Sequence, residues 1–139
     1  MLDKAIALAA HKFVGKFDKG GAPYILHCLH VMAAVAPDRN LMTAAVLHDI
    51  VEDTDTTLDD LRSIGFSERT INTVAVLTHD KDEPYEKYIK RIVVFDDARK
   101  IKLADLEHNS LITRLKGFTK KDFDRLEKYV WAYEYLKMV

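Results

Sequence analysis

Apolar residues recur every three or four positions along nearly the whole chain, the spacing that lines one face of an α-helix. Residues 2–17 follow this pattern and predict an amphipathic first helix, which ends at the glycine-rich loop 19–23. Residues 23–36 and 41–50 predict a second and a third helix, both strongly apolar. These early helices are expected to supply much of the core.

The downstream half continues in the same way, with helices separated by capping residues rather than by long loops. The only β-branched run, 92–95, lies between helix signals, so no strand is predicted. The expected boundaries are an Asp38 cap, a start at Thr56 or Thr57, a stop at Gly65, a Ser67 cap, a start at Pro84, a cap at Asp96 or Asp97, and a Thr119 cap. The pattern predicts an all-α fold, a single helical bundle over 1–139.

Composition narrows the class of protein. The chain is 48% apolar and 31% charged, as in ordinary globular proteins, and its net charge of −1 gives no basic field to attract nucleic acid. The basic stretch 114–128 is interleaved with acids and is interpreted as a solvated helix face. Cys28, the only cysteine, excludes an internal disulfide. No membrane span or signal peptide is recognised, so cytoplasm is the expected location.

Four polar residues interrupt the apolar pattern at the end of the predicted third helix. His48 and Asp49 follow its apolar face directly, and Glu52 and Asp53 come one turn later. Buried polar groups need partners, and a divalent metal ion is one that suits an imidazole beside a carboxylate. Taken alone, the His48-Asp49 pair is equally compatible with a metal site and with ordinary polar residues at a helix end.

Other histidines and acids extend the candidate site. His27 lies in the apolar second helix, and Asp105 lies on an apolar face with Lys102 and Asn109 one turn away on either side. A core histidine and a solvated lysine are the alternatives for His27 and Lys102. Three other histidines are interpreted as non-ligands: His11 as packing or surface, His30 as surface or outer support of the site, and His79 as part of a polar loop.

Four motifs in this order and spacing resemble the HD-domain metal-dependent phosphohydrolases. They are Pro-Tyr-Ile-Leu-His at 23–27, His-Asp at 48–49, Glu-Asp at 52–53 and Lys-Leu-Ala-Asp-Leu-Glu-His-Asn at 102–109. More closely, the chain resembles the hydrolase domain of the RelA/SpoT family, which removes pyrophosphate from guanosine tetraphosphate. The resemblance runs from about residue 10 to about residue 115.

The resemblance implies a set of roles. Glu52 and Asp53 would form the catalytic pair that orients water and moves its proton. Mn²⁺ is the implied ion, and Zn²⁺, Ni²⁺, Fe²⁺ or Mg²⁺ could compete for the site. The implied metal ligands are His27, His48, Asp49 and Asp105, and the implied substrate contacts are Lys19, Lys102 and Asn109.

Two positions depart from the family pattern, both on the side of substrate recognition. Asp18 stands where the hydrolases carry an arginine that packs against guanine, although the following Lys19 is kept. Ile112 stands where they carry a hydroxyl residue. An aspartate cannot stack like a guanidinium and repels phosphate, so the metal chemistry is the firmer part of the prediction.

The sequence therefore predicts a small metal-dependent pyrophosphohydrolase acting on guanosine tetraphosphate or a related nucleotide. Its expected partner is that nucleotide, without nucleic acid or membrane, and a homo-oligomer is possible. An HD-type nucleotidase acting on nucleoside monophosphates is one alternative. A non-catalytic metal- or nucleotide-binding regulatory module is another, although such a module would not require Glu52 and Asp53.

Overall fold

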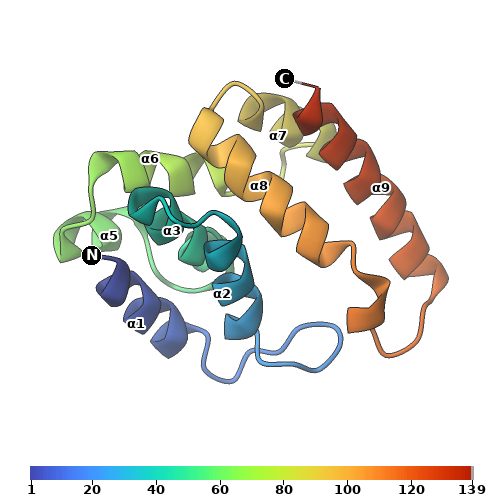
Figure 1. The fold of residues 1–139 in the computed structure, drawn as a ribbon, viewed down its shortest axis with the longest axis horizontal. Helices are drawn as coiled ribbons and strands as arrows, with labels where there is room; N and C mark the ends of the chain where they lie inside the picture. The colour runs from blue at the N-terminus through green and yellow to red at the C-terminus, as the bar shows by residue number, and fades with distance from the viewer. Residues whose placement is uncertain (139) are drawn as a thin grey trace.

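The computed structural model describes residues 1–138 and shows a helical protein (Figure 1). Within that range there are nine α-helices, one 3-10 helix and no named strand, so the prediction of an all-α fold is confirmed. The helices are α1 (Leu2–Lys12), α2 (Ile25–Ala34), α3 (Arg39–Val46), α4 (Ile50–Asp53), α5 (Leu58–Ile64), α6 (Glu68–Leu77), α7 (Tyr85–Ile92), α8 (Asp96–Asn109), η1 (Ile112–Arg114) and α9 (Lys120–Lys137).

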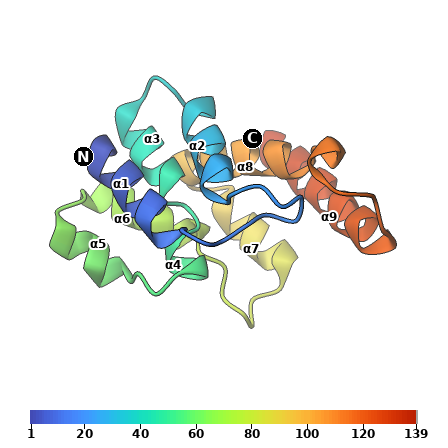
Figure 2. The same ribbon diagram turned by 90° about the horizontal axis from the view of Figure 1, so that it is seen from below.

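The helix α8 runs through the middle of the molecule. It packs against α2 and α6 on one side and against α9 on the other (Figure 1). The loop between α1 and α2 extends beneath the bundle toward the segment that joins α8 to α9, as the view from below shows (Figure 2). Asp18 of this loop and Arg114 of this segment are neighbours although they are 96 positions apart in sequence.

The first helix is shorter than its apolar pattern predicts. It ends at Lys12 rather than near residue 17, because Gly15 adopts φ = 82°, which a right-handed helix cannot contain. Phe13 is still buried, but Phe17 is 60% exposed on the following loop. The helix packs closely on α3 through the fully buried Ala5 and Ala9.

The predicted third helix, 41–50, is interrupted at the candidate site. The helix α3 ends at Val46, and the chain turns before α4 begins at Ile50. Leu47 and Ile50 stay fully buried on either side of the turn, which anchors it in the core. The break places His48 and Asp49, consecutive in sequence, so that both side chains reach one point, which adjacent residues on a regular helix cannot do.

Most of the predicted caps are confirmed. The side chains of Asp38, Thr57, Ser67 and Thr119 each accept a backbone N–H at a helix start, and Gly65 ends α5 with φ = 105°. Pro84 precedes α7, as expected.

The predicted cap of α8 is wrong. Phe95 takes the cap position without a side-chain hydrogen bond, and Asp96 is already inside the helix. The carboxylate of Asp96 pairs with Arg99, while that of Asp97 pairs with Arg69 of α6. A carboxylate in the first turn still interacts favourably with the helix dipole, which is why the sequence signal was off by one residue.

The buried apolar residues form two clusters. One joins α2, α3, α6, α7, α8 and α9, and the other joins α1, α2, α3, α4, α5 and α6. The second helix contributes Val31 to the first cluster and Cys28 to the second, next to His27. The candidate site therefore lies where the two clusters meet, among rigid elements.

Candidate metal centre and active site

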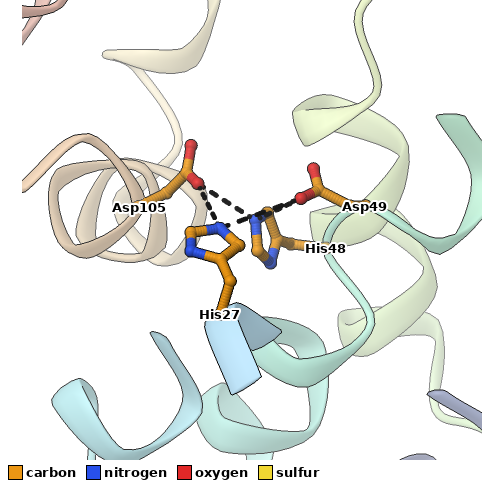
Figure 3. A group of neighbouring side chains, drawn as sticks. All are labelled: His27, His48, Asp49 and Asp105. Atoms are coloured by element: carbon orange, nitrogen blue, oxygen red, sulfur yellow. Dashed lines mark hydrogen bonds and ion pairs between the residues drawn. The ribbon is translucent and has the colours of Figure 1, made fainter. Parts of the chain in front are cut away.

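The four predicted metal ligands come together from three segments of the chain. His27 projects from α2, His48 and Asp49 from the turn between α3 and α4, and Asp105 from α8 (Figure 3). One donor atom from each residue lies within 4.8 Å of all the others. Asp49 is partly exposed and the other three are buried, so the cluster is open on one side.

The spacing of these donors fits a divalent ion. Nε2 of His27 lies 2.9 Å from Oδ1 of Asp105, and Nε2 of His48 lies 3.3 Å from the same oxygen. Oδ2 of Asp49 lies 3.0 Å from Nε2 of His48 and 4.0 Å from Nε2 of His27. Ligands bound at about 2.1 Å and at right angles lie about 3 Å apart, and opposed ligands lie about 4 Å apart.

The outward nitrogens of both histidines are engaged by other groups. Nδ1 of His48 donates to the carbonyl oxygen of Ala45 at 2.7 Å, and Nδ1 of His27 lies 2.7 Å from Nδ1 of His108. Burial, followed by the cationic Arg114, lowers the pKa of His108 to about 4, so this ring is neutral and its Nδ1 can accept a hydrogen bond from Nδ1–H of His27. Both imidazoles thus turn Nε2 inward, as metal-bound histidines with such partners do.

The two carboxylates are oriented as well. The hydroxyl of Tyr24 donates to Oδ2 of Asp49 at 2.5 Å. Lys102 donates to Oδ2 of Asp105 at 2.8 Å, and the amide of Asn109 donates to Oδ1 of the same carboxylate at 3.0 Å. These contacts hold the oxygen of Asp105 that faces the histidines in a fixed position.

The electrostatics of the cluster favour a bound cation. Burial alone would raise the pKa of Asp105, but Lys102 and the two imidazoles outweigh it and hold that pKa well below its usual range. Burial would likewise lower the pKa of His48, but Asp49 and Asp105 raise it well above its usual value. The buried carboxylates thus draw positive charge into the site, and a metal ion supplies that charge without a proton.

A pocket of about 370 Å³ opens over this cluster. Asp49 and Asp105 contribute to its wall, while His27 and His48 lie behind them. The wall combines five cationic with five acidic side chains, together with aromatic and small residues. The lining residues are Lys16, Phe17, Asp18, Lys19, Gly20, Tyr24, Asp49, Glu52, Asp53, Lys102, Asp105, Asn109, Leu111, Arg114, Leu115, Arg125 and Tyr129.

The predicted catalytic pair, Glu52 and Asp53, lies in the wall beside the metal cluster. An oxygen of Glu52 accepts the backbone N–H of His79 at 2.8 Å, and Asp53 forms an ion pair with Lys16 at 3.3 Å. Burial is the largest cause that raises the pKa of both carboxyl groups. The negative charge of Asp49 raises both pKa values further. A raised pKa suits a carboxylate that takes and returns a proton near neutral pH.

No protein-family model matches the chain, but curated proteins do. It is 30% identical over 135 residues to a guanosine-3′,5′-bis(diphosphate) 3′-pyrophosphohydrolase of Drosophila melanogaster, covering 88% of this chain and 74% of that protein. It is 32% identical over 145 aligned positions to the protein of that name in Xenopus tropicalis, covering 94% and 79%. The chain belongs to the guanosine-3′,5′-bis(diphosphate) 3′-pyrophosphohydrolase family.

Two further matches are a bacterial protein of the same family and a solved structure. The Aquifex aeolicus enzyme is 36% identical over 115 residues, which make up 75% of this chain but only 16% of that protein. A solved structure of a metazoan ortholog of SpoT that hydrolyses ppGpp superposes with a TM-score of 0.83 at 24% identity, over 97% of this chain and 84% of that one. The second match shows that the fold is shared.

The pocket contains all three residues that the resemblance assigned to substrate. Lys19 lines it from the loop between α1 and α2, and Lys102 and Asn109 line it from α8, where both donate to Asp105. Lys102 is not a solvated lysine, because its side chain is only 14% exposed and pairs with Asp105. Their contact with a pyrophosphohydrolase substrate stays a prediction.

Several pocket residues were missed by sequence reasoning. Arg114, Arg125 and Tyr129 line the pocket, although the stretch 114–128 was interpreted as a solvated face. That interpretation fits the exposed Lys116, Lys120, Lys121 and Lys128 but is wrong for the two arginines. The four-residue spacing of Arg125 and Tyr129, which places them on one helix face, was the available signal.

The two departures from the family pattern have different consequences here. Asp18 does not present an unpaired charge, because its carboxylate lies 3.0 Å from Arg114 and also accepts two backbone N–H groups. Its expected repulsion of phosphate is therefore reduced. Ile112 is 53% exposed, and the pocket is lined by Leu111 instead.

The remaining histidines outside the cluster match their interpretation. His11 is exposed, and His30 is exposed while stacking on His108 at a ring separation of 3.8 Å. His79 donates from Nε2 to the carbonyl oxygen of Glu83 and stays out of the metal cluster, although its backbone holds Glu52.

Among residues 1–138, no helix has the length and apolar character needed to cross a membrane.

Proposed function

We propose that this protein hydrolyses guanosine tetraphosphate, releasing pyrophosphate from the 3′ position and leaving guanosine diphosphate. The observation that carries the proposal is the placement of Glu52 and Asp53, with raised pKa values, beside four converging metal donors in one pocket. The names of the related enzymes supply the substrate.

We propose that one Mn²⁺ ion is held by the four donors, with Zn²⁺, Ni²⁺, Fe²⁺ and Mg²⁺ as competitors. Two imidazoles and two carboxylates suit a borderline-to-hard divalent ion, and the donor spacing fits its bond lengths. A divalent ion in this place supplies Lewis acidity, which polarises a phosphoryl group and lowers the pKa of water.

The protein's own residues then have separate tasks. Glu52 and Asp53 accept a proton from the water that attacks the phosphorus attached to the 3′ oxygen. The bond between that phosphorus and the 3′ oxygen breaks, pyrophosphate leaves, and the 3′ oxygen takes up a proton. The backbone N–H of His79 holds Glu52 toward the pocket, and Lys16 does the same for Asp53.

The distribution of cations supports a substrate with phosphate groups at two places. Lys102 lies beside the metal donors, whereas Lys19 and Arg125 lie on another part of the pocket wall. Burial, and next the positive charge of Arg125, lower the pKa of Lys19, while Asp122, the partner of Arg125, opposes this change. Cations on two parts of one pocket wall suit a substrate that carries phosphate groups at two places, which favours it over a nucleoside monophosphate.

We place this reaction in the cytoplasm. The protein relies on no disulfide, since Cys28 is its only cysteine and is buried.

Product analysis tests the proposal. Metal-stripped protein is supplied with Mn²⁺ and guanosine tetraphosphate, and the products are separated by ion-exchange chromatography. Equal amounts of guanosine diphosphate and pyrophosphate are expected, with no reaction on guanosine monophosphate. Release of inorganic phosphate from the monophosphate would instead support a nucleotidase. Tight nucleotide binding without turnover across all five metals would support a regulatory module and contradict the proposal.

A further inference from the structure

The loop 15–23 is closed by the side chain of Asp18. Oδ1 of this aspartate accepts the backbone N–H groups of Gly20 and Ala22, both at 2.9 Å. Oδ2 points the other way and accepts from Nη2 of Arg114 at 3.0 Å. The side chain is only 14% exposed, so this ion pair is largely shielded from solvent. One carboxylate thus shapes its own loop and ties it to a segment 96 positions away.

Arg114, the last residue of η1, is fixed by three acceptors. Besides Asp18, it donates from Nη1 to the carbonyl oxygen of His108 at 2.9 Å and to Oδ1 of Asn109 at 3.2 Å. Its side chain is 22% exposed. A planar guanidinium can reach three acceptors in fixed directions, whereas a lysine in the same place has a single nitrogen to share among them.

The contact with Arg114 decides how the amide of Asn109 is turned. Because Oδ1 of Asn109 accepts from Arg114, Nδ2 faces Asp105 and donates to its Oδ1 at 3.0 Å. The opposite orientation would direct the amide oxygen at a carboxylate oxygen and the amide nitrogen at a guanidinium, and both contacts would repel. The oxygen of Asp105 in question is the one that faces Nε2 of both His27 and His48.

The two segments also approach each other at the level of the backbone. A Cβ atom on Gly20 would lie 1.8 Å from the carbonyl oxygen of Arg114. Only a residue without a side chain permits this approach. The contact between the loop and η1 is therefore built into the chain at two independent points.

We propose that Asp18 and Arg114 are positioning residues: their ion pair joins the loop 15–23 to η1 and holds Asn109 in the orientation that orders Asp105 for the metal ion. This inference concerns the pocket of the proposed function. Its central readout is metal affinity, which requires no assumption about the substrate.

A double-mutant cycle tests the proposal. Arg114→Lys keeps a positive charge opposite Asp18 but cannot hold Asn109 and Asp18 together. Asn109→Ala removes a direct partner of a metal ligand, for which a loss of about 10- to 100-fold in metal affinity is typical. For Arg114→Lys, which acts one contact further out, a loss of roughly three- to tenfold in Mn²⁺ affinity is expected, measured by titration with paramagnetic resonance of free Mn²⁺.

The decisive comparison is made in the Asn109→Ala background. If Arg114 acts through Asn109, adding Arg114→Lys produces no further loss of Mn²⁺ affinity. An equal loss with and without Asn109 would overturn the proposal, as would unchanged Mn²⁺ affinity in Arg114→Lys alone. Arg69→Lys is the matched control, because Arg69 pairs with Asp97 away from the pocket, and its Mn²⁺ affinity should equal that of the unmodified protein.

Asp18→Asn provides a second approach if Arg114→Lys folds poorly. The amide keeps an oxygen for the N–H groups of Gly20 and Ala22 and loses only the ion pair. The same direction of change in Mn²⁺ affinity is expected, without additivity to Arg114→Lys. Failure to hydrolyse guanosine tetraphosphate would contradict the proposed function alone, whereas an additive cycle in Mn²⁺ affinity would contradict this inference alone.

Discussion

At the scale of single residues, the site depends on where its outer contacts place each polar atom. Ala45, His108 and Lys102 hold atoms of the two histidines and of Asp105 that do not face the centre. Tyr24 binds the oxygen of Asp49 that does face it. The sequence motifs indicated the four converging residues but not these partners. His108 and Tyr24 are distant in sequence from the ligands they hold, so no local spacing reveals those contacts. Ala45 and Lys102 are three residues from theirs, but that spacing alone does not show that the groups bond.

Loss of one ligand should abolish metal binding. In Asp49→Ala the remaining three donors keep two imidazoles and one carboxylate, so we expect Mn²⁺ affinity to fall by more than about 100-fold and activity to be lost with it. Asp80→Ala is a matched control, because Asp80 follows a histidine in the same dipeptide but lies exposed outside the cluster. Tight Mn²⁺ binding by Asp49→Ala in a calorimetric titration would contradict the ligand assignment.

Glu52→Gln should separate metal binding from turnover. The glutamine oxygen can still accept the N–H of His79, so the side chain stays in place while its basicity is lost. We expect unchanged Mn²⁺ affinity and a fall in kcat of about 100- to 10,000-fold, measured as pyrophosphate release. A variant with near-normal kcat would show that proton transfer does not require this residue.

The acid side of the pH profile of hydrolysis should report the ionisation of Glu52. A base must be ionised to accept a proton, and burial, together with Asp49, raises the pKa of Glu52 above its ordinary value of 4.5. We therefore expect kcat/KM, at saturating Mn²⁺, to fall about tenfold per pH unit below an inflection that lies higher than 4.5. An inflection at or below 4.5, or one that persists in the residual activity of Glu52→Gln, would argue against this assignment.

At the scale of elements, local rules predicted helix type and most helix starts, but not the two places where helices end early. The caps at Asp38, Thr57, Ser67 and Thr119 are read from adjacent residues and were found. The break after Val46 was not, because the apolar pattern continues through Leu47 and Ile50, which are buried on both sides of the turn. Leu47 and Ile50 are apolar because the core buries them, although α3 has already ended at Val46.

The cap of α3 should affect stability without affecting the metal site. Asp38 accepts the N–H groups of Asn40 and Leu41, so Asp38→Ala should cost about 1 kcal/mol in the free energy of unfolding. Denaturant unfolding measures this cost, and Asp82→Ala, at an exposed loop position, serves as the control. A loss of Mn²⁺ affinity in the folded Asp38→Ala variant would show that the α3 start and the site are coupled.

At the scale of the whole molecule, the site lies at the meeting point of two apolar clusters. Elements from both clusters contribute ligands, so the site is complete only when both clusters are packed. The motif order revealed the family and the fold, because each motif is short and contiguous. The pocket wall opposite the motifs, with Arg114 and Arg125, was not foreseen, since it depends on how α8, η1 and α9 return toward the loop 15–23.

Metal binding should therefore stabilise the fold as a whole. A ligand that binds only the folded state adds RT ln(1 + [L]/Kd), or about 2.7 kcal/mol at one hundred times Kd. We expect Mn²⁺ to raise the Tm of the unmodified protein and of Asp80→Ala, but not that of Asp49→Ala. Equal shifts in all three would place the stabilising ion elsewhere on the protein.

The most direct measurement of the central claim relates bound metal to chemistry. Metal-stripped protein is titrated with Mn²⁺ while bound ion and the rate of pyrophosphate release from guanosine tetraphosphate are followed together. We expect the rate to rise in proportion to the ion bound and to level off at one equivalent per chain. Pyrophosphate release that is independent of bound metal, or one tightly bound equivalent without any release, would contradict the account.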